Sequence, residues 1–196
     1  MGSIDVGPYY LGSGNLSTAA AITHRDLRLA INGAHSIKVP LVLGTAGTAG
    51  AASHLEKTLE VVRRIAREEG RTLRVATIRS DIDRSWLKKM AGAQRVRPIG
   101  NIPPLNDGTI ERATNIVGQA GSEAFIRALQ LEPDIVVAGR ACDTSVFAAI
   151  PLMLGYPAGP TIHMAKIIEC TSICCDPGGV MLCWRRCMAT TSIWRA

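Results

Sequence analysis

The sequence is poor in aromatic residues and has no hydrophobic run long enough to cross a membrane. Phe, Trp and Tyr make up only 4% of the 196 residues, so the core has to be filled mainly by Leu, Ile, Val and Ala. A bilayer-spanning helix needs about 20 consecutive apolar residues, and no segment supplies them. The N-terminus also lacks the basic start and apolar centre of a signal peptide, so we expect a cytoplasmic protein.

The positive charge of the chain is spread among acids rather than gathered in one run. The formal net charge is +6, and Arg185, Arg186 and Arg195 contribute three of these charges from a tail that contains no acid. Elsewhere basic and acidic residues alternate, as in EKTLEVVRRIAREEGR from residue 56 to residue 71, a pattern typical of a solvated helix face. Without a basic cluster interleaved with aromatic residues, we expect no nucleic-acid partner and no membrane partner.

Six cysteines are present, but their arrangement does not favour a metal centre. Cys170 and Cys174 have the same Cys-x3-Cys spacing as Cys183 and Cys187, and structural zinc sites usually combine two short-spaced pairs on well-formed loops. The second pair here encloses a tryptophan and two arginines in an atypical tail. We therefore expect reduced thiols and no bound metal, and the sequence does not identify a cofactor.

Short apolar segments alternate with helical patterns along the chain. Residues 37–44, 72–78 and 134–139 predict three strands, since they are short and rich in β-branched residues. The predicted helices cover residues 23–36, 53–70, 85–93, 108–121, 122–133, the later part of 139–155, and 157–170. This alternation predicts an α/β fold with an open, mostly parallel sheet and helices on both faces, in a Rossmann-like three-layer arrangement.

Local signals predict where these segments begin and end. Thr23 and Ser53 are candidate N-caps, Asn106 or Asp107 is another, and Gly70 is a candidate helix end. The segments expected to lack regular structure are the glycine-rich residues 7–16 and the proline-rich residues 95–107.

The loops that follow the three strands are the candidate ligand site. They cover residues 44–50, 79–83 and 139–144, and ligands of open parallel sheets bind beyond the carboxyl ends of the strands. In the first loop, GTAGTAG, glycines let the backbone approach a ligand, and the following helix offers free N–H groups. The alternative is a tight strand-to-helix turn with close packing. The candidate ligand contacts in this loop are Gly44, Thr45, Gly47 and Gly50.

Charged residues stand in the other two loops. Arg140 is a candidate clamp for a carboxylate or phosphate, and Ser80 is a further candidate ligand contact. Asp143 is a candidate catalytic base, and the alternative is that it caps the next helix. Asp81 is a candidate base as well, unless it or Asp83 pairs with Arg140; for Asp83 we favour helix capping.

A third candidate base lies at the end of the last predicted helix. Glu169 follows the apolar sequence KII, where its carboxylate could accept a proton. The alternative is a salt bridge with Lys166, one helical turn earlier. His163 shares this helix, and we expect it to be structural.

Five motifs in sequence order carry a resemblance to a known family. They are DVGPYYLGSG, PLVLGTAGTAG, ERATNIVGQAGSEAFIRAL, IVVAGRACDTSVFAAIP and AKIIEC. Together they resemble the acyclic terpene utilisation protein A (AtuA-like) family over roughly residues 3–179. The resemblance implies a metabolic enzyme domain in the bacterial breakdown of branched acyclic terpenoids such as citronellol and geraniol. It would act on or bind a branched acyl-CoA or carboxylate at the C-terminal edge of the sheet.

Two alternatives to an enzyme domain remain. One is a non-catalytic partner subunit of an acyl-CoA carboxylase or lyase, and the other is an inactive fragment. Family members are typically longer and begin with an additional strand, so the resemblance implies a truncated member whose sheet lacks its first strand. It also implies either a homo-oligomer or association with pathway enzymes.

The C-terminal residues differ in character from the rest. Residues 1–180 match the N-terminal part of the family, whereas residues 181–196 hold two of the three tryptophans and no acid. Plausible codons for this tail, read one base earlier, encode two apolar-rich runs around a His-Gly-Asp-Asp turn. We therefore expect a non-native tail that arose by a frameshift and packs poorly.

Overall fold

The structure is a computed structural model that describes residues 8–170, 184–187 and 192–195, with the side chains of residues 8–170. Its elements in chain order are α1 (Pro8–Ser13), α2 (Ala20–Ser36), β1 (Leu41–Leu43), α3 (Ala52–Glu68), β2 (Val75–Ile78), α4 (Arg84–Gly92), α5 (Asp107–Arg112), α6 (Ser122–Leu129), β3 (Ile135–Ala138), α7 (Asp143–Met153), α8 (Ala158–Glu169), β4 (Trp184–Cys187) and β5 (Ser192–Arg195).

The central sheet has three parallel strands in the order β1-β3-β2. Strand β3 is hydrogen-bonded on both sides, and all four of its residues are buried. An uninterrupted apolar run such as IVVA suits this position, because a parallel strand inside a sheet is covered on both faces. The predicted α/β class with an open parallel sheet is therefore confirmed.

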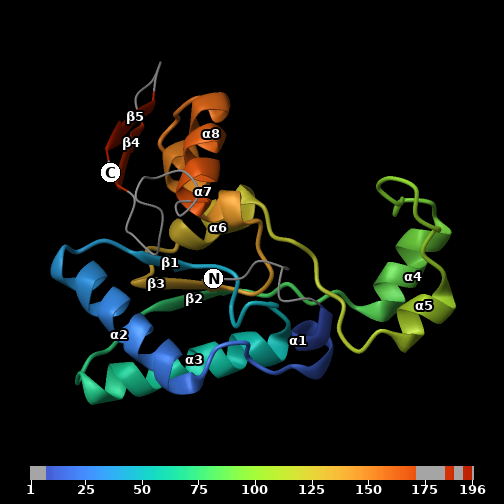
Figure 1. The fold of residues 1–196 in the computed structure, drawn as a ribbon, viewed down its shortest axis with the longest axis horizontal. Coiled ribbons are helices and arrows are strands. Elements are labelled where there is room, and N and C mark those ends of the chain that lie inside the picture. The colour runs from blue at the N-terminus through green and yellow to red at the C-terminus, as the bar shows by residue number, and fades with distance from the viewer. Residues whose placement is uncertain (1–7, 171–183, 188–191, 196) are drawn as a thin grey trace.

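The path of the chain explains why helices lie on both faces of this sheet. The chain passes from β1 to β2 and then turns back to place β3 between them. Parallel crossovers are right-handed, so crossovers in opposite directions carry their helices on opposite faces. Figure 1 shows α2 and α3 on one face and α6, α7 and α8 on the other.

Two apolar clusters form the core, one on each face of β3. Ile135 and Val137 pack with buried residues of α2 and α3, such as Ile31 and Leu55. The other two residues of β3 point to the opposite face and pack with α6 and α7. Phe125 of α6 is fully buried in this second cluster. Side chains alternate between the faces of a strand, so two of the four residues of β3 belong to each cluster.

Helix α3 shows how the sequence specifies one of these layers. Its apolar positions recur with helical spacing, and six of its residues are buried. The helix ends as predicted just before Gly70, which has φ +60°. The Gly70 N–H donates to the Arg67 carbonyl oxygen and the Arg71 N–H to that of Ala66, bonds that satisfy the last carbonyls of the helix.

Several predicted boundaries are wrong. Residues 8–13 form helix α1 instead of a loop, and α2 begins at Ala20, so Thr23 lies inside it and its hydroxyl donates to the Ala19 carbonyl oxygen. Helix α3 begins at Ala52 without a side-chain cap from Ser53. Asn106 does cap α5, accepting a hydrogen bond from the Thr109 N–H.

The largest error concerns residues 113–121, which were predicted to be helical but are extended. The Gly118 N–H donates to the Ser80 carbonyl oxygen at 2.7 Å, and the Ala120 N–H donates to the Arg140 carbonyl oxygen at 2.9 Å. These bonds run to loops distant in the sequence. They replace the helical hydrogen bonds and lay the segment across the carboxyl edge of the sheet.

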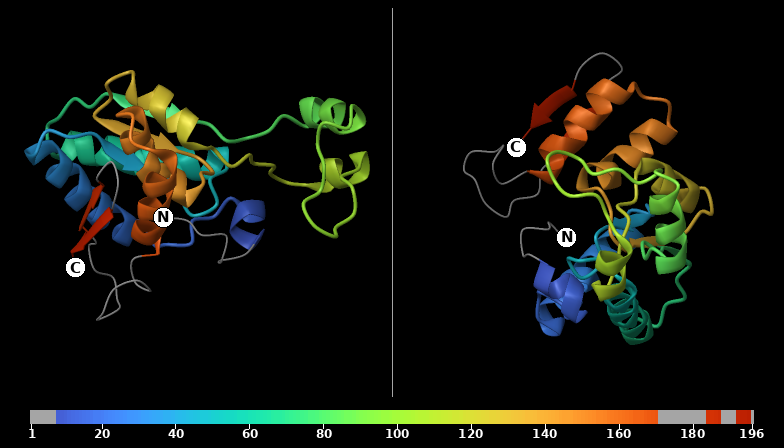
Figure 2. Two further views of the ribbon diagram at one scale, coloured as in Figure 1. Left: turned by 90° about the horizontal axis from the view of Figure 1, so that it is seen from above. Right: turned by 90° about the vertical axis from the view of Figure 1, so that its right-hand side faces the viewer.

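Helices α4 and α5 form an arm that stands away from the sheet and the other helices (Figures 1 and 2). We define the arm as residues 84–112, in which only Leu87 and Ile110 are buried. It holds six basic and two acidic residues, a net charge of +4. The alternation of charges seen in α3 therefore does not extend to this part of the chain.

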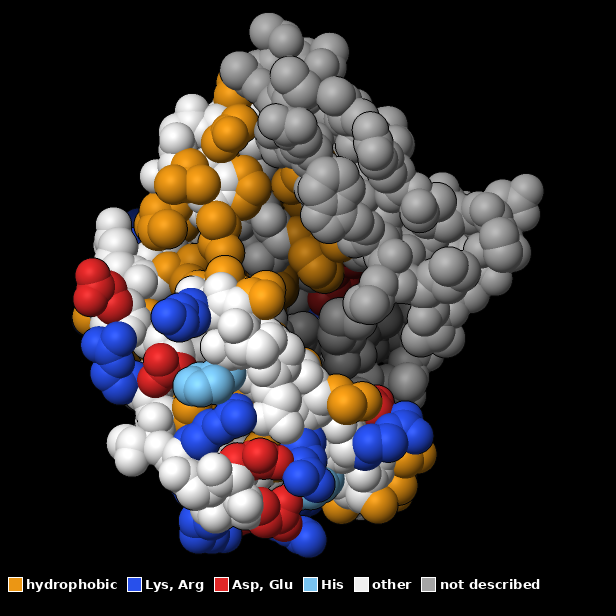
Figure 3. Space-filling model, turned by 90° about the vertical axis from the view of Figure 1, so that its left-hand side faces the viewer, with side chains coloured by type: hydrophobic (Ala, Val, Ile, Leu, Met, Phe, Trp, Pro, Cys, Tyr) orange, Lys and Arg blue, Asp and Glu red, His pale blue; other side chains and the backbone are white. Residues whose placement is uncertain are grey.

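Apolar side chains are also exposed on the body of the molecule. Figure 3 shows them gathered over the upper part, where α7 and α8 lie, while charged side chains cover the lower part, formed by α2 and α3. The exposed apolar residues of α7, α8 and the turn between them are Ile150, Met153, Leu154 and Ile162. Among the described residues, no helix is both long and apolar enough to span a membrane.

The described part of the C-terminal tail is a pair of strands. Strands β4 and β5 pair antiparallel, with Trp184 opposite Arg195. The rest of the proposed non-native tail, including Cys183, lies outside the described residues, as does Cys174. The frameshift hypothesis and the division at residue 180 stay predictions.

Candidate functional site

The three loops that follow the strands meet at the carboxyl edge of the sheet, as their positions in the sequence predicted. The Arg140 N–H donates to the Gly50 carbonyl oxygen at 3.0 Å. The hydroxyl of buried Ser80 donates to the Arg140 carbonyl oxygen at 2.8 Å. Thr45 joins the first and third loops twice, because its Oγ1 donates to the Ala141 carbonyl oxygen and accepts from the Ala141 N–H.

The glycines of the first loop serve these contacts between loops. A Cβ atom on Gly50 would lie 2.2 Å from the backbone nitrogen of Arg140, and one on Gly44 would lie 2.9 Å from Val146. At Gly47 the nearest atoms belong to Leu16 and His54. Protein atoms occupy the space beside all three glycines. This favours the alternative in which the glycines allow close packing of the loops rather than close approach of a ligand.

Asp81 lies at the N-terminus of α3. Its Oδ1 accepts a hydrogen bond from the Ala52 N–H at 3.0 Å. The N-terminus of a helix attracts anions through its free N–H groups and dipole, and here a carboxylate of the protein itself uses that position. Asp83 caps α4, as expected, by accepting a hydrogen bond from the Trp86 N–H.

A cluster of charged side chains lies where α7 begins and α8 ends. Asp143 is the first residue of α7, and the N-cap residue before it, Cys142, makes no side-chain cap hydrogen bond. Burial raises the pKa of the Asp143 carboxyl, and the negative charge of Glu169 adds to this rise. The positive charges of Arg140 and Lys166 oppose it. The structure thus brings two of the predicted bases, Asp143 and Glu169, close to the predicted clamp.

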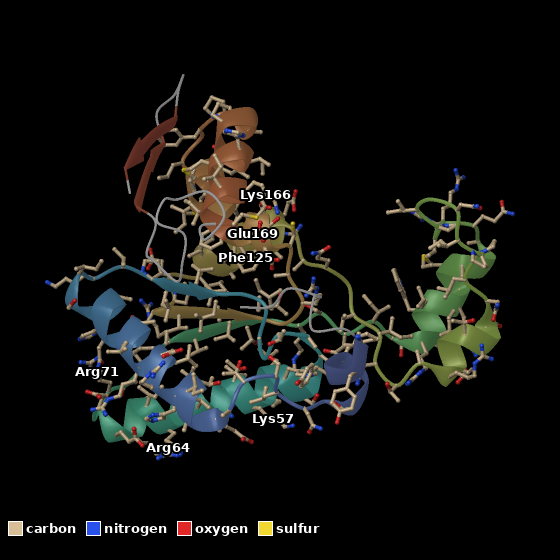
Figure 4. The ribbon with its side chains drawn as sticks, in the orientation of Figure 1. Lys57, Arg64, Arg71, Phe125, Lys166 and Glu169 are labelled. Carbon is tan, nitrogen blue, oxygen red and sulfur yellow. The ribbon has the colours of Figure 1, made fainter. Side chains whose placement is uncertain are left out.

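Glu169 is held by its neighbours on α8. Its carboxylate pairs with the Lys166 ammonium at 2.5 Å and accepts a hydrogen bond from the Cys170 thiol at 3.1 Å. The hydrogen bond to Glu169 raises the pKa of the Cys170 thiol. Figure 4 shows Lys166 and Glu169 together above Phe125. The predicted salt-bridge alternative for Glu169 is therefore present in the structure.

The arrangement gives Asp143 and Glu169 different chemistry. A carboxylate whose pKa is raised by burial binds a proton more readily near neutral pH, which is the property required of a general base. Glu169 forms an ion pair with the Lys166 ammonium. Asp143 therefore has the raised pKa that a general base requires, and the positive charge of Arg140 acts on it.

Sequence reasoning missed two contributions to this edge. Cys170 follows the predicted base directly, yet nothing in its spacing indicated a contact with Glu169. Gln119 comes from the segment mistaken for a helix, and its Nε2 donates to the Ala141 carbonyl oxygen at 3.3 Å. Within the described residues, no group of three or more His, Cys, Asp or Glu side chains is placed to hold a metal ion.

Comparison with known proteins gives one match. Residues 26–188 match the model of the acyclic terpene utilisation family protein AtuA, which is most of the chain. The chain belongs to this family. The part matched to AtuA includes the three strands of the central sheet, the loops that follow them and the charged cluster of α7 and α8. No curated protein and no solved structure matches the chain.

Replacing Gly50 with alanine tests whether the loops need their close contact. We expect Gly50→Ala to lower the free energy of unfolding by at least about 3 kcal/mol, because its Cβ would overlap the Arg140 backbone. The matched control is Gly70→Ala, which has a similar positive φ but open space around the new Cβ and should cost about 1 kcal/mol. Urea denaturation measures both, and equal costs would refute the role given to this contact.

The raised pKa of Asp143 predicts a pH-dependent effect on stability. The folded state favours the protonated carboxyl, so Asp143 destabilises the fold increasingly as pH rises above its ordinary pKa of 3.8 and through its folded-state pKa. We expect Asp143→Asn to raise the melting temperature at pH 7, and the gain to vanish near pH 3.8. Exposed Glu60 on α3 provides the control Glu60→Gln, and a lower melting temperature for Asp143→Asn at pH 7 would contradict the assignment.

Proposed function

We propose that this AtuA-family chain is a metabolic enzyme domain of acyclic terpene catabolism, of the citronellol and geraniol type. It binds a branched acyl-CoA or carboxylate at the carboxyl edge of the sheet. The observation that supports this most is the position of Asp143. Its partly buried carboxyl has a raised pKa and lies within the electrostatic reach of Arg140 and of the Lys166–Glu169 pair.

In this proposal Arg140 binds the negative charge of the ligand and Asp143 moves a proton. The backbone of Arg140 is fixed on both sides by the hydrogen bonds to Gly50 and Ser80. One guanidinium nitrogen donates to the Thr48 carbonyl oxygen at 3.5 Å. A guanidinium can bind a carboxylate through two parallel hydrogen bonds.

The position of Asp81 supports an anion site at Arg140 rather than at the start of α3. A phosphate group at that helix N-terminus would meet the Asp81 carboxylate, and like charges at such a distance repel. The proposal therefore gives Asp81 a capping role and leaves the proton transfer to Asp143, with Glu169 as its charged neighbour. We further propose that the sheet is Rossmann-like, because a core cluster covers each face of β3.

Removing the Arg140 side chain tests the clamp. Saturating 3-methylcrotonyl-CoA should raise the melting temperature of the native chain, and Arg140→Ala should abolish most of this rise because a phosphate of the CoA moiety loses its positive partner. Arg79→Ala is the matched control, since Arg79 directly follows β2 and pairs with Glu56. Equal stabilisation of the native chain and Arg140→Ala would exclude the clamp.

The arm favours a second candidate function, that of a partner subunit of an acyl-CoA carboxylase or lyase. Its apolar side chains are uncovered, with Ile99 94% and Ile102 59% exposed, and its net charge is +4. A small element with two buried residues gains little stability on its own. An acidic protein surface with apolar side chains would cover the arm and balance its charge.

Substitutions in the arm separate the two candidates. Ile99→Ser together with Ile102→Ser should weaken binding to the purified acyl-CoA carboxylase of the pathway at least about tenfold, because apolar contact area is lost. Leu131→Ser, at an apolar position on the body that is 71% exposed, serves as the control. Surface plasmon resonance measures the affinities, and no binding by the native chain would count against the partner function.

A further inference from the structure

A cavity of about 110 Å³ lies beside the glycine-rich loop, on the face of the sheet covered by α2 and α3. Its walls come from β1, the loop after β1, both helices and the segment before α2. Five threonines and three leucines line it, and none of its lining residues is ionisable. It is distinct from the charged cluster, which lies at the start of α7.

The threonine hydroxyls of this cavity are largely used within the protein. Thr58 donates to the His54 carbonyl oxygen, and Thr23 donates to that of Ala19. Thr45 bonds to the backbone of Ala141, and Thr48 shares a short hydrogen bond with the Ser17 hydroxyl. Four of the five threonine hydroxyls are thus engaged within the protein, and most of the surface that lines the cavity is apolar.

The size and charge of the cavity restrict what it can hold. A cavity of about 150 Å³ lined by apolar side chains accommodates benzene, which has six heavy atoms. A cavity of about 110 Å³ therefore suits four or five carbon atoms. An anion inside it would lose its hydration without gaining a charged partner, at a large cost in free energy.

The wall of this cavity is shared with Arg140. Thr48 lines the cavity, and its carbonyl oxygen lies 3.5 Å from a guanidinium nitrogen of Arg140. Thr48 has φ +75°, a left-handed conformation that is strained for a β-branched residue and that persists only where surrounding contacts fix it. Its contacts with Ser17 and Arg140 keep this strained residue between the cavity and the guanidinium.

We infer that the cavity binds a compact alkyl group of four or five carbon atoms, at the uncharged end of the ligand whose acid group Arg140 binds. The orientation of the ligand in this inference rests on the proposed function, whereas binding of the alkyl group by the cavity does not. The cavity then selects ligands by the size of their apolar end, and Arg140 selects them by charge.

Two probes test the two parts separately. We would titrate 3-methylbutan-1-ol and 3-methylbutanoate into the chain and follow the methyl signals of the threonines by NMR. Both probes should shift the signals of Thr45 and Thr48. No shift with the alcohol at its solubility limit would overturn the cavity assignment.

Variants that fill the cavity complete the test. Thr23→Leu removes only the hydrogen bond to the Ala19 carbonyl oxygen at the start of α2, and Leu27→Phe adds volume from the same helix. Each should weaken binding of both probes about tenfold or more. Ile22→Phe, at an exposed position of α2, should leave binding unchanged. Undiminished binding of the alcohol by either folded cavity variant would overturn the inference, and if both fail to fold, the native threonine shifts decide.

Arg140→Ala distinguishes failure of the cavity from failure of the proposed clamp. If both ideas hold, this variant binds 3-methylbutan-1-ol as tightly as the native chain but loses about tenfold in affinity for 3-methylbutanoate. Equal affinity for the acid would refute the clamp while the cavity result stands. Loss of the acid in Arg140→Ala, with no effect of the cavity variants, would refute the cavity alone.

Discussion

The structure depends on the contact between the backbone of Gly50 and the backbone of Arg140. It joins the loop after β1 to the loop after β3, and no residue with a Cβ fits at Gly50 without moving one of them. Ser80 adds the loop after β2 through the same Arg140 backbone. The three strand exits are therefore held as one unit, and the side chains of Arg140 and Asp143 project from a fixed base.

The same contact gives the glycine-rich loop a structural role. Glycines after a parallel strand usually suggest a phosphate site, but here the space they leave is filled by protein, and Asp81 uses the N-terminus of the following helix. The loop instead supplies Thr45 and Thr48 to the wall of an apolar cavity. The charged residue Arg140 lies in the loop after β3. The uncharged cavity wall and the guanidinium of Arg140 thus lie on either side of Thr48.

Features set by neighbouring residues could be predicted from the sequence, and features set by distant partners could not. The three strands and the end of α3 just before Gly70 follow from local composition. The extended path of residues 113–121 does not, because its hydrogen bonds run to Ser80 and Arg140. Similarly, α3 is capped by Asp81 from another loop, although Ser53 was the nearer candidate. The meeting of Arg140, Asp143 and Glu169 was predictable as a region, whereas the raised pKa of Asp143 depends on burial that only the fold supplies.

The strand order has a consequence for how the protein is made. Strands β1 and β2 share no hydrogen bonds, since β3 lies between them. During synthesis β1 and β2 therefore emerge before β3, the strand that joins them, and this part of the sheet closes only after Ala138 has left the ribosome. Until then the apolar faces of α2 and α3 have no finished sheet to cover. Assembly of this domain should be a late, nearly all-at-once event, with exposed strand edges beforehand that favour aggregation or chaperone binding.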